Sequence, residues 1–217
     1  VSTVKKIDAY TKGVSVEECP VTTFDWSNMQ KTYTGMETTV DVKAQAVAKL
    51  MQYCGASVGM NYGTGSSGAS SSDIPQALVD YFGYDQRVKY LRRSHYSTSE
   101  WENIIYQELE AKRPVYYSGS STGGGHAFVC DGFSEDGYFH INWGWTGRGD
   151  GYFLLSVLNP NERGAGAGSS NDGYTIVQDI VIGIEKPTGS PELEDGRMAV
   201  HECSYTGTTT LGRSSSC

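Results

Sequence analysis

The stretch GGGHAFVCDGFSEDGYFHINWGWTGRGDG, residues 123–151, decides the fold. Its first strand-like run opens with His126 directly after three glycines, and its second run carries Asn142. Both runs are rich in the β-branched and aromatic residues that favour strands, and residues 135–137 (Glu-Asp-Gly) supply turn residues between them. The stretch therefore predicts an antiparallel hairpin with the histidine on one strand and the asparagine on the other.

This hairpin brings together a histidine and an amide that could act as a pair. A histidine that takes a proton from a thiol needs a fixed tautomer, and an Asn side-chain oxygen accepting its ring N–H would supply it. With Phe133 opposite Tyr138, simple pairing sets His126 against Trp145, so a bulge is needed to bring Asn142 to His126. Asn142 as a plain strand-end residue remains the alternative.

Two tryptophans follow the asparagine in the NWGW motif. Trp143 and Trp145 both suit a core, where their large rings bury apolar surface. A tryptophan over the His–Asn pair would also exclude water and strengthen the hydrogen bond. We expect Trp143, next to Asn142, to do this.

The rest of the chain divides into a helical half and a strand-rich half. Apolar residues at helical spacing predict a helix over 40–54, capped by Thr38 or Thr39 and ended by Gly55, with Val40, Ala44, Val47, Met51 and Cys54 facing inward. Further helices are expected from Ser72 to Gly83 and from Ser97, paired with Glu100 in a capping box, to Pro114. Strands are expected over residues 115–118, 126–133, 138–145, 152–158 and 174–184. This order predicts an α+β fold of two lobes, with a cleft between them.

Bulk composition limits the function. The chain has 217 residues, 38% of them hydrophobic, which suits one folded domain. A formal charge of −8 without clusters of Lys and Arg argues against nucleic acid or an anionic membrane as partner. No apolar run approaches the roughly 20 residues that span a bilayer.

The motifs resemble a known family. GGHAFVCDGF, YFHINWGW and DGYFLLSVLNP are similar to the C-terminal half of the streptopain family of papain-like cysteine peptidases. The similarity extends upstream through FDWSNM, VAKLMQYCG, VGMNYG and ELEAKRPVYYSG, and covers about residues 24–187. It implies a papain-like two-lobe fold whose N-terminal part is missing here.

The resemblance also implies roles for particular residues. His126 would be general base and acid, Asn142 its orienting partner and Trp143 their cover. Ser66, Gly125 and Trp143 would border the substrate channel, and the glycine-rich loop at 164–173 would flank it. The expected enzyme is a secreted, extracellular cysteine endopeptidase that cleaves proteins or peptides and needs no cofactor.

The nucleophile is not evident in this chain. In the resembled family the nucleophilic cysteine opens a long helix N-terminal to the FDW segment, and no such stretch occurs here. Cys54 lies at the C-terminal end of its predicted helix, where a thiolate is disfavoured, and Cys130 lies about 13 Å along the strand from His126. Cys19 has no helix to activate it, and Cys203 and Cys217 lie in the tail. We therefore expect the cysteine to come from an upstream segment of the same precursor, whether that segment is lost, cleaved off or carried on another polypeptide.

Other interpretations stay open at this stage. Strands rich in Tyr and Trp also suit a carbohydrate-binding module, and the missing nucleophile suits an inactive remnant that acts as a binding protein. A metal site is disfavoured because His95, His126, His140 and His201 are widely spaced. Residues 1–187 are taken as the peptidase part, and 188–217 as a linker or the stub of a further module.

Overall fold

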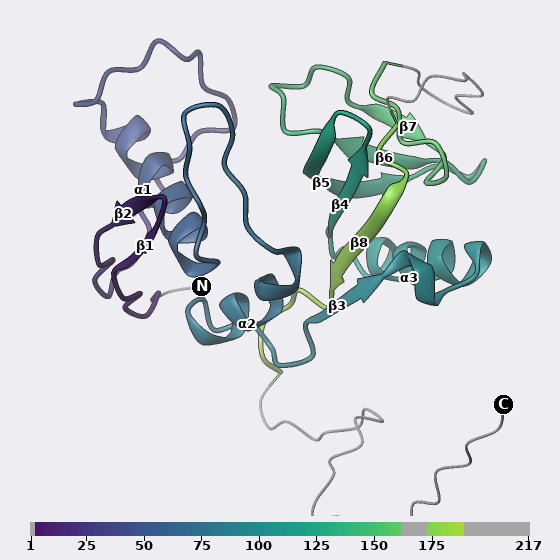
Figure 1. Cartoon of the computed structure of the whole chain (residues 1–217), viewed down its shortest axis with the longest axis horizontal. Helices are drawn as coiled ribbons and strands as arrows, with labels where there is room; N and C mark the ends of the chain where they lie inside the picture. Colours follow the sequence, from purple (N-terminus) through teal and green to yellow (C-terminus); the bar gives the residue numbers. More distant parts are fainter. Residues whose placement is uncertain (1–2, 162–172, 189–217) are drawn as a thin grey trace, which may run out of the picture.

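A computed structural model of the chain describes residues 3–161 and 173–188. Figure 1 shows two lobes, one built around a long helix and a short hairpin, the other around a six-stranded sheet with a helix against it. The α+β fold with two lobes is confirmed. The glycine-rich loop at 164–173 lies almost wholly outside the described residues, as does the tail from 189 onward.

The elements follow the expected order, helices before most strands. The helices are α1 (Val42–Ser57), α2 (Ile74–Asp80) and α3 (Thr98–Glu110), with 3-10 turns η1 (Ser71–Asp73) and η2 (Arg93–His95). The strands are β1 (Tyr10–Lys12), β2 (Val14–Val16), β3 (Lys89–Arg92), β4 (Val115–Ser121), β5 (Gly124–Phe133), β6 (Phe139–Asn142), β7 (Gly151–Phe153) and β8 (Ile176–Ile182).

The large sheet is antiparallel throughout, in the order β3-β8-β4-β5-β6-β7. Within the predicted hairpin, Phe133 pairs with Phe139 rather than with Tyr138, so the expected register was wrong by one residue. A bulge does occur, between Cys130 and Gly132, and beyond it Val129 pairs with Asn142. His126 pairs on its other side with Gly119 of β4.

Helix α3 begins as its sequence predicts. The Ser97 hydroxyl accepts from the Glu100 N–H, and the Glu100 carboxylate accepts from the Ser97 N–H at 2.8 Å, which completes the capping box. The helix lays Trp101, Ile105 and Leu109 on the sheet, against a core that includes Val115, Tyr117, Phe128, Cys130, Ile141 and Ile180. This core occupies one face of β4 and β5.

Helix α1 differs from its predicted form in two ways. Asp41 is its N-cap, in place of Thr38 or Thr39, and the helix runs through Gly55 to Ser57. Its buried residues are Ala46, Tyr53, Gly55 and Ala56, which pack with Val4, Ile7, Cys19, Phe24 and Phe82 in a second core. On the predicted apolar face, Met51 is 67% exposed, and Val40, which lies ahead of the helix, is 79% exposed.

Two small features escaped the sequence analysis, the β1–β2 hairpin and the edge strand β3. Both are short, at three or four residues per strand, and the pairing partner of β3 is β8, 87 to 93 positions away. Such pairing cannot be read from local periodicity.

In the described part of the chain, no helix is both long and apolar enough to cross a membrane.

Candidate active site

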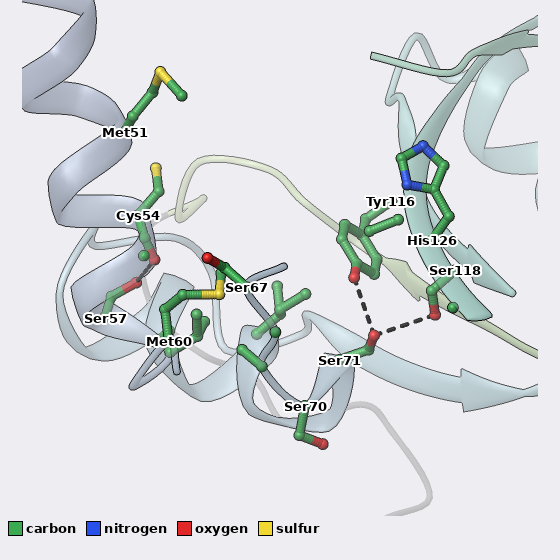
Figure 2. Close-up of a pocket in the computed structure, with 18 of the residues that line it drawn as sticks. Met51, Cys54, Ser57, Met60, Ser67, Ser70, Ser71, Tyr116, Ser118 and His126 are labelled. Atoms are coloured by element: carbon green, nitrogen blue, oxygen red, sulfur yellow. Dashed lines mark hydrogen bonds between the residues drawn. The ribbon is translucent and has the colours of Figure 1, made fainter. Parts of the chain in front are cut away.

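His126 stands where β5 leaves the core. Its Nε2 lies 2.8 Å from the main-chain oxygen of Trp143. Because a carbonyl oxygen can only accept, Nε2 must carry the proton and donate it, which leaves Nδ1 as the acceptor in the neutral ring. Figure 2 shows the ring at the side of a pocket, with one nitrogen facing into it. The geometry is that of a proton acceptor with a fixed tautomer.

The peptide unit between Trp143 and Gly144 is held at both ends. Its carbonyl accepts from His126, and its N–H donates to Oδ1 of Asn142 at 2.9 Å. The preceding N–H, that of Trp143, donates to a carboxylate oxygen of Asp150, also at 2.9 Å. Gly144 has φ +77°, a left-handed conformation that glycine adopts without steric cost. The turn that aims the carbonyl at His126 is therefore fixed by its neighbours.

The sequence analysis expected a direct hydrogen bond between Asn142 and His126. Among the described residues, the two side chains form no such bond. The register explains this difference. Asn142 pairs with Val129, and both lie on the exposed side of the sheet, whereas His126 belongs to the alternate row with Phe128 and Cys130. The amide acts on the histidine through one peptide unit.

The imidazole is surrounded by aromatic rings. Trp145 stacks on it with ring centroids 4.6 Å apart and planes 23° apart, while the Trp143 ring is 6.4 Å away. Tyr174 adds a tilted ring at 5.5 Å. Trp143 is fully buried and packs against Phe128 at 4.6 Å, whereas Trp145 is 37% exposed. Trp145 is thus the ring that covers His126. Sequence reasoning assigned this place to Trp143 because it adjoins Asn142.

A pocket of about 1620 Å³ lies between α1 and the outer face of β4 and β5. His126, Gly125 and Ser66 all line it. Trp143 is not among its lining residues in the described part of the chain. Met51 and Cys54 of α1 stand on the side away from His126, as Figure 2 shows.

Hydroxyl groups line the pocket below His126. Ser71 of η1 lies 3.0 Å from the Tyr116 hydroxyl and donates to the Ser118 hydroxyl at 3.1 Å, which joins the two lobes (Figure 2). Burial raises the pKa of the Tyr116 phenol, so it stays neutral and able to donate. The sequence analysis missed this trio because Ser71 lies 45 positions from Tyr116 and 47 positions from Ser118.

The serine–glycine loop that carries Ser66 is positioned from α1. A Cβ placed at Gly55 would overlap the hydroxyl of Tyr62, so that the tyrosine packs directly on the helix only because residue 55 has no side chain. The loop is closed on itself by Asn61 and Gly68, which exchange two main-chain hydrogen bonds of 2.9 and 3.1 Å. Ser66 sits within that closure.

The described cysteines lack the setting of a nucleophile. Cys19 and Cys130 are buried, and burial raises the pKa of both thiols. Cys54 is exposed, but it lies in the last turn of α1, where the helix dipole disfavours a thiolate, and the desolvation around its thiol raises its pKa too. A raised pKa lowers the thiolate fraction at neutral pH. Among the described residues there is also no group of three or more His, Cys, Asp or Glu that could hold a metal.

Comparison with known proteins identifies the family. The model of the peptidase C10 family matches residues 4–153. The chain belongs to the peptidase C10 family. This membership covers both lobes and includes His126, Asn142 and Trp143.

Related proteins and solved structures agree with this family membership. Streptopain of Streptococcus pyogenes (serotype M28) is 43% identical over 162 residues, 75% of this chain and 40% of the relative. The thiol protease/hemagglutinin PrtT of Porphyromonas gingivalis is 41% identical over 75% of this chain and 18% of its own length. Active interpain A of Prevotella intermedia, a cysteine protease, superposes with a TM-score of 0.71 at 33% identity, covering 85% of this chain and 75% of that one.

The papain-like cysteine peptidase fold is therefore established. The chain spans only 40% of the length of streptopain. The family match favours the peptidase interpretation over the carbohydrate-binding alternative.

Proposed function

We propose that this chain is the histidine-bearing part of a cysteine endopeptidase, with His126 as general base and acid. The observation that carries the proposal is the His126 ring, whose Nε2 donates to the Trp143 carbonyl while the other ring nitrogen is left for the pocket. Asn142 is proposed as a positioning residue, because its side-chain oxygen holds the N–H of the same peptide unit.

The nucleophilic cysteine is proposed to come from a segment ahead of Val1. The raised pKa values of Cys19, Cys54 and Cys130 argue against each of these as the nucleophile, and Cys203 and Cys217 lie outside the described residues. About a quarter of active interpain A lies outside the match, since this chain covers 75% of it.

The pocket is large enough to bind that upstream segment. At about 1620 Å³ it is larger than the roughly 300–1,000 Å³ of ordinary ligand pockets. It is walled on one side by α1, whose Met51 is 67% exposed, and Trp26, 53% exposed, also lines it. A helix with an apolar face would cover these side chains, and a cysteine at its N-terminus would gain the thiolate stabilisation of the helix dipole.

The chemistry follows from the free Nδ1. The thiol gives its proton to Nδ1, and the thiolate attacks the peptide carbonyl carbon. As the C–N bond breaks, the imidazolium protonates the leaving amine, which departs and leaves an acyl-enzyme. His126 then takes a proton from water, hydroxide attacks the thioester, and the returned proton restores the thiol. Trp145 stacked on the ring would stabilise the imidazolium of both half-reactions.

The proposed substrates are proteins or peptides, and the proposed location is extracellular. Ser66 and Gly125 line the pocket beside His126, so a peptide laid there would contact both. Gly125 has no side chain, which would let the substrate backbone approach β5 closely.

Alkylation with mass mapping tests the origin of the cysteine. The 217-residue chain should label slowly at Cys54 and only after unfolding at Cys19 and Cys130. The longest product of its gene should gain one fast-reacting cysteine ahead of Val1, and that product, but not its His126→Ala variant, should cleave casein. Fast, His126-dependent labelling of Cys19 or Cys54 would sink the proposal. A folded full-length protein with no fast thiol and no cleavage would identify an inactive remnant.

A further inference from the structure

We infer that Asp150 is a positioning residue for His126, an inference that rests on the proposed function. Asp150 is the last residue of the loop 143–150, which joins β6 to β7. Across the neck of this loop, its Oδ1 accepts from the main-chain N–H of Trp143 at 2.9 Å. The carboxylate therefore closes the loop at the residue whose carbonyl binds His126.

Two groups that hold the imidazole belong to this loop. The Trp143 carbonyl accepts from Nε2 of His126 at 2.8 Å, and the Trp145 ring stacks on the imidazole with centroids 4.6 Å apart. Because these two residues are nearly adjacent, a change in the path of the loop would displace both groups at once. The position of the imidazole therefore depends on what keeps the loop in shape.

Local backbone preference does not keep the loop in shape. Its left-handed residues are Gly144, Thr146, Gly147 and Gly149. Thr146, at φ +54°, is β-branched, and such a residue is a genuine outlier in this region. The three glycines leave the unfolded loop many other conformations. Strained residues persist only where their surroundings hold them, so the loop needs an anchor such as the bond across its neck.

The ring of Trp143 supplies no polar anchor. Within residues 3–161 and 173–188, its buried indole N–H has no hydrogen-bond acceptor. Gly149 packs on the same ring, since a Cβ at this position would lie 3.4 Å from Cδ1 of Trp143. This close approach places Asp150 beside the main-chain N–H of Trp143. A hydrogen bond to a carboxylate is roughly twice as strong as one between neutral groups, so the backbone of Trp143 is held firmly.

Asp150 and Asn142 hold the two peptide units on either side of the Trp143 Cα. Asp150 binds the N–H of the unit before it, and Asn142 binds the N–H of the unit after it, which belongs to Gly144. The backbone has only two soft dihedrals per residue, φ and ψ. Because both planes are held, both dihedrals of Trp143 are fixed, and with them the direction of its carbonyl toward His126.

Nitrogen-15 NMR of the 217-residue chain tests the inference on His126 itself. In wild type the two ring nitrogens should differ, with the proton on Nε2. In Asp150→Ala their shifts should move toward the average of a free imidazole that exchanges between both tautomers. The proton on Nε2 should also exchange with water about 10-fold faster or more, as expected for the loss of a hydrogen bond to a charged group.

Asp41→Ala is the matched control. The Asp41 carboxylate also accepts a main-chain N–H, that of Lys43 at 2.8 Å, but it caps α1 in the other lobe (Figure 1). This variant should lose stability, because it loses a helix cap, and should leave the His126 signals as they are in wild type. Loss of the His126 tautomer in both variants would show a general effect of destabilisation and would overturn the inference.

Peptide hydrolysis by the longest product of the gene gives a second readout. Asp150→Ala should lower kcat by about 10- to 100-fold and leave KM within about twofold, because Asp150 is not among the described residues that line the pocket. Asp150→Asn keeps an oxygen acceptor without the charge, so it should lose less than Asp150→Ala in both readouts.

An unchanged His126 tautomer or an unchanged kcat in a folded Asp150→Ala variant would overturn the inference. If that variant does not fold, Asp150→Asn decides, and wild-type values for it count against the inference. If the wild-type product cleaves no peptide, the proposed function fails, while the NMR series on the chain still decides the role of Asp150.

Discussion

His126 and Asn142 bind opposite ends of one peptide unit, the first through its carbonyl at 2.8 Å and the second through its N–H at 2.9 Å. A peptide unit is planar and rigid, so fixing the N–H also fixes the direction of the carbonyl. It is polarised as well, and a hydrogen bond at one end strengthens the acceptor at the other. The asparagine can thus orient the imidazole without touching it.

The tautomer of His126 is the first expected outcome. Nitrogen-15 NMR of the chain at a pH where the imidazole is neutral should find the proton on Nε2 and a bare Nδ1, since the Trp143 carbonyl cannot donate. His140 provides an internal comparison, because its Nδ1 faces the Asp131 carboxylate at 2.5 Å and should carry a proton. A bare Nε2 in His126 would contradict the geometry.

Replacing Asn142 by alanine should lower kcat/KM moderately. The loss removes one hydrogen bond on the positioning peptide, worth about 1 kcal/mol, or about fivefold in rate. Asn142→Asp keeps an acceptor oxygen and should lose less. The pH dependence of kcat/KM should move in Asn142→Ala, which a purely structural role would leave alone. A loss of a thousandfold would instead indicate direct contact with the imidazole.

The two tryptophans should separate stability from activity. Trp143→Ala empties a fully buried site and should cost about 3–5 kcal/mol of unfolding free energy. Trp145→Ala, at a 37% exposed site, should change stability far less but lower kcat/KM by about 5- to 30-fold, as the stacking ring stabilises the imidazolium. Denaturant unfolding of both variants measures the loss of stability, and peptide hydrolysis measures the loss of kcat/KM. Equal effects on stability would contradict this division.

Acid should weaken the fold through Glu108. This carboxylate of α3 accepts from Arg113 at 2.8 and 2.9 Å and from the Gly183 N–H at 3.0 Å. Burial alone would raise its pKa, but the hydrogen bonds from Arg113 and Gly183, with the Arg113 charge, lower it. Because the folded pKa lies below the unfolded value of about 4.3, the contribution is complete above that pH and is lost as pH falls through the folded pKa.

The corresponding variant is Glu108→Gln. It should cost about 1–3 kcal/mol at pH 7, and below about pH 4 its stability should approach that of wild type. Glu110→Gln, at an exposed position on the same helix, is the control and should be neutral at both pH values. Urea unfolding between pH 3 and 7 measures both. A pH-independent difference between Glu108→Gln and wild type would show that the charge is irrelevant.

The sequence predicted helices and strands better than it predicted which residues contact one another. The α3 capping box and the strands after Pro114 follow from local residue types, so they could be read directly. The contact between His126 and the Trp143 carbonyl could not, because a backbone atom leaves no mark in the sequence. The predicted register was off by one residue at Phe133, but the bulge between Cys130 and Gly132 cancels this slip, so Asn142 pairs with Val129 as simple pairing from Phe133 and Tyr138 also implied.

The helix α1 shows a different limit. Its sequence has apolar residues on more than one face, and periodicity alone selected the one with Met51 and Cys54, which are both exposed in this chain. The face with Ala46, Tyr53 and Ala56 is buried instead. Which face a helix buries depends on which partners are present, and a sequence read alone does not name them.

The contact between Gly55 and Tyr62 has an evolutionary consequence. Because the tyrosine hydroxyl occupies the space a methyl group would need, a larger residue at 55 is tolerable only if the residue at 62 shrinks or the loop carrying Ser66 moves. Across the relatives these two positions should therefore change together. Where they do, the wall of the cleft has been reshaped from inside the helix, and substrate choice can drift while every residue near the imidazole stays the same.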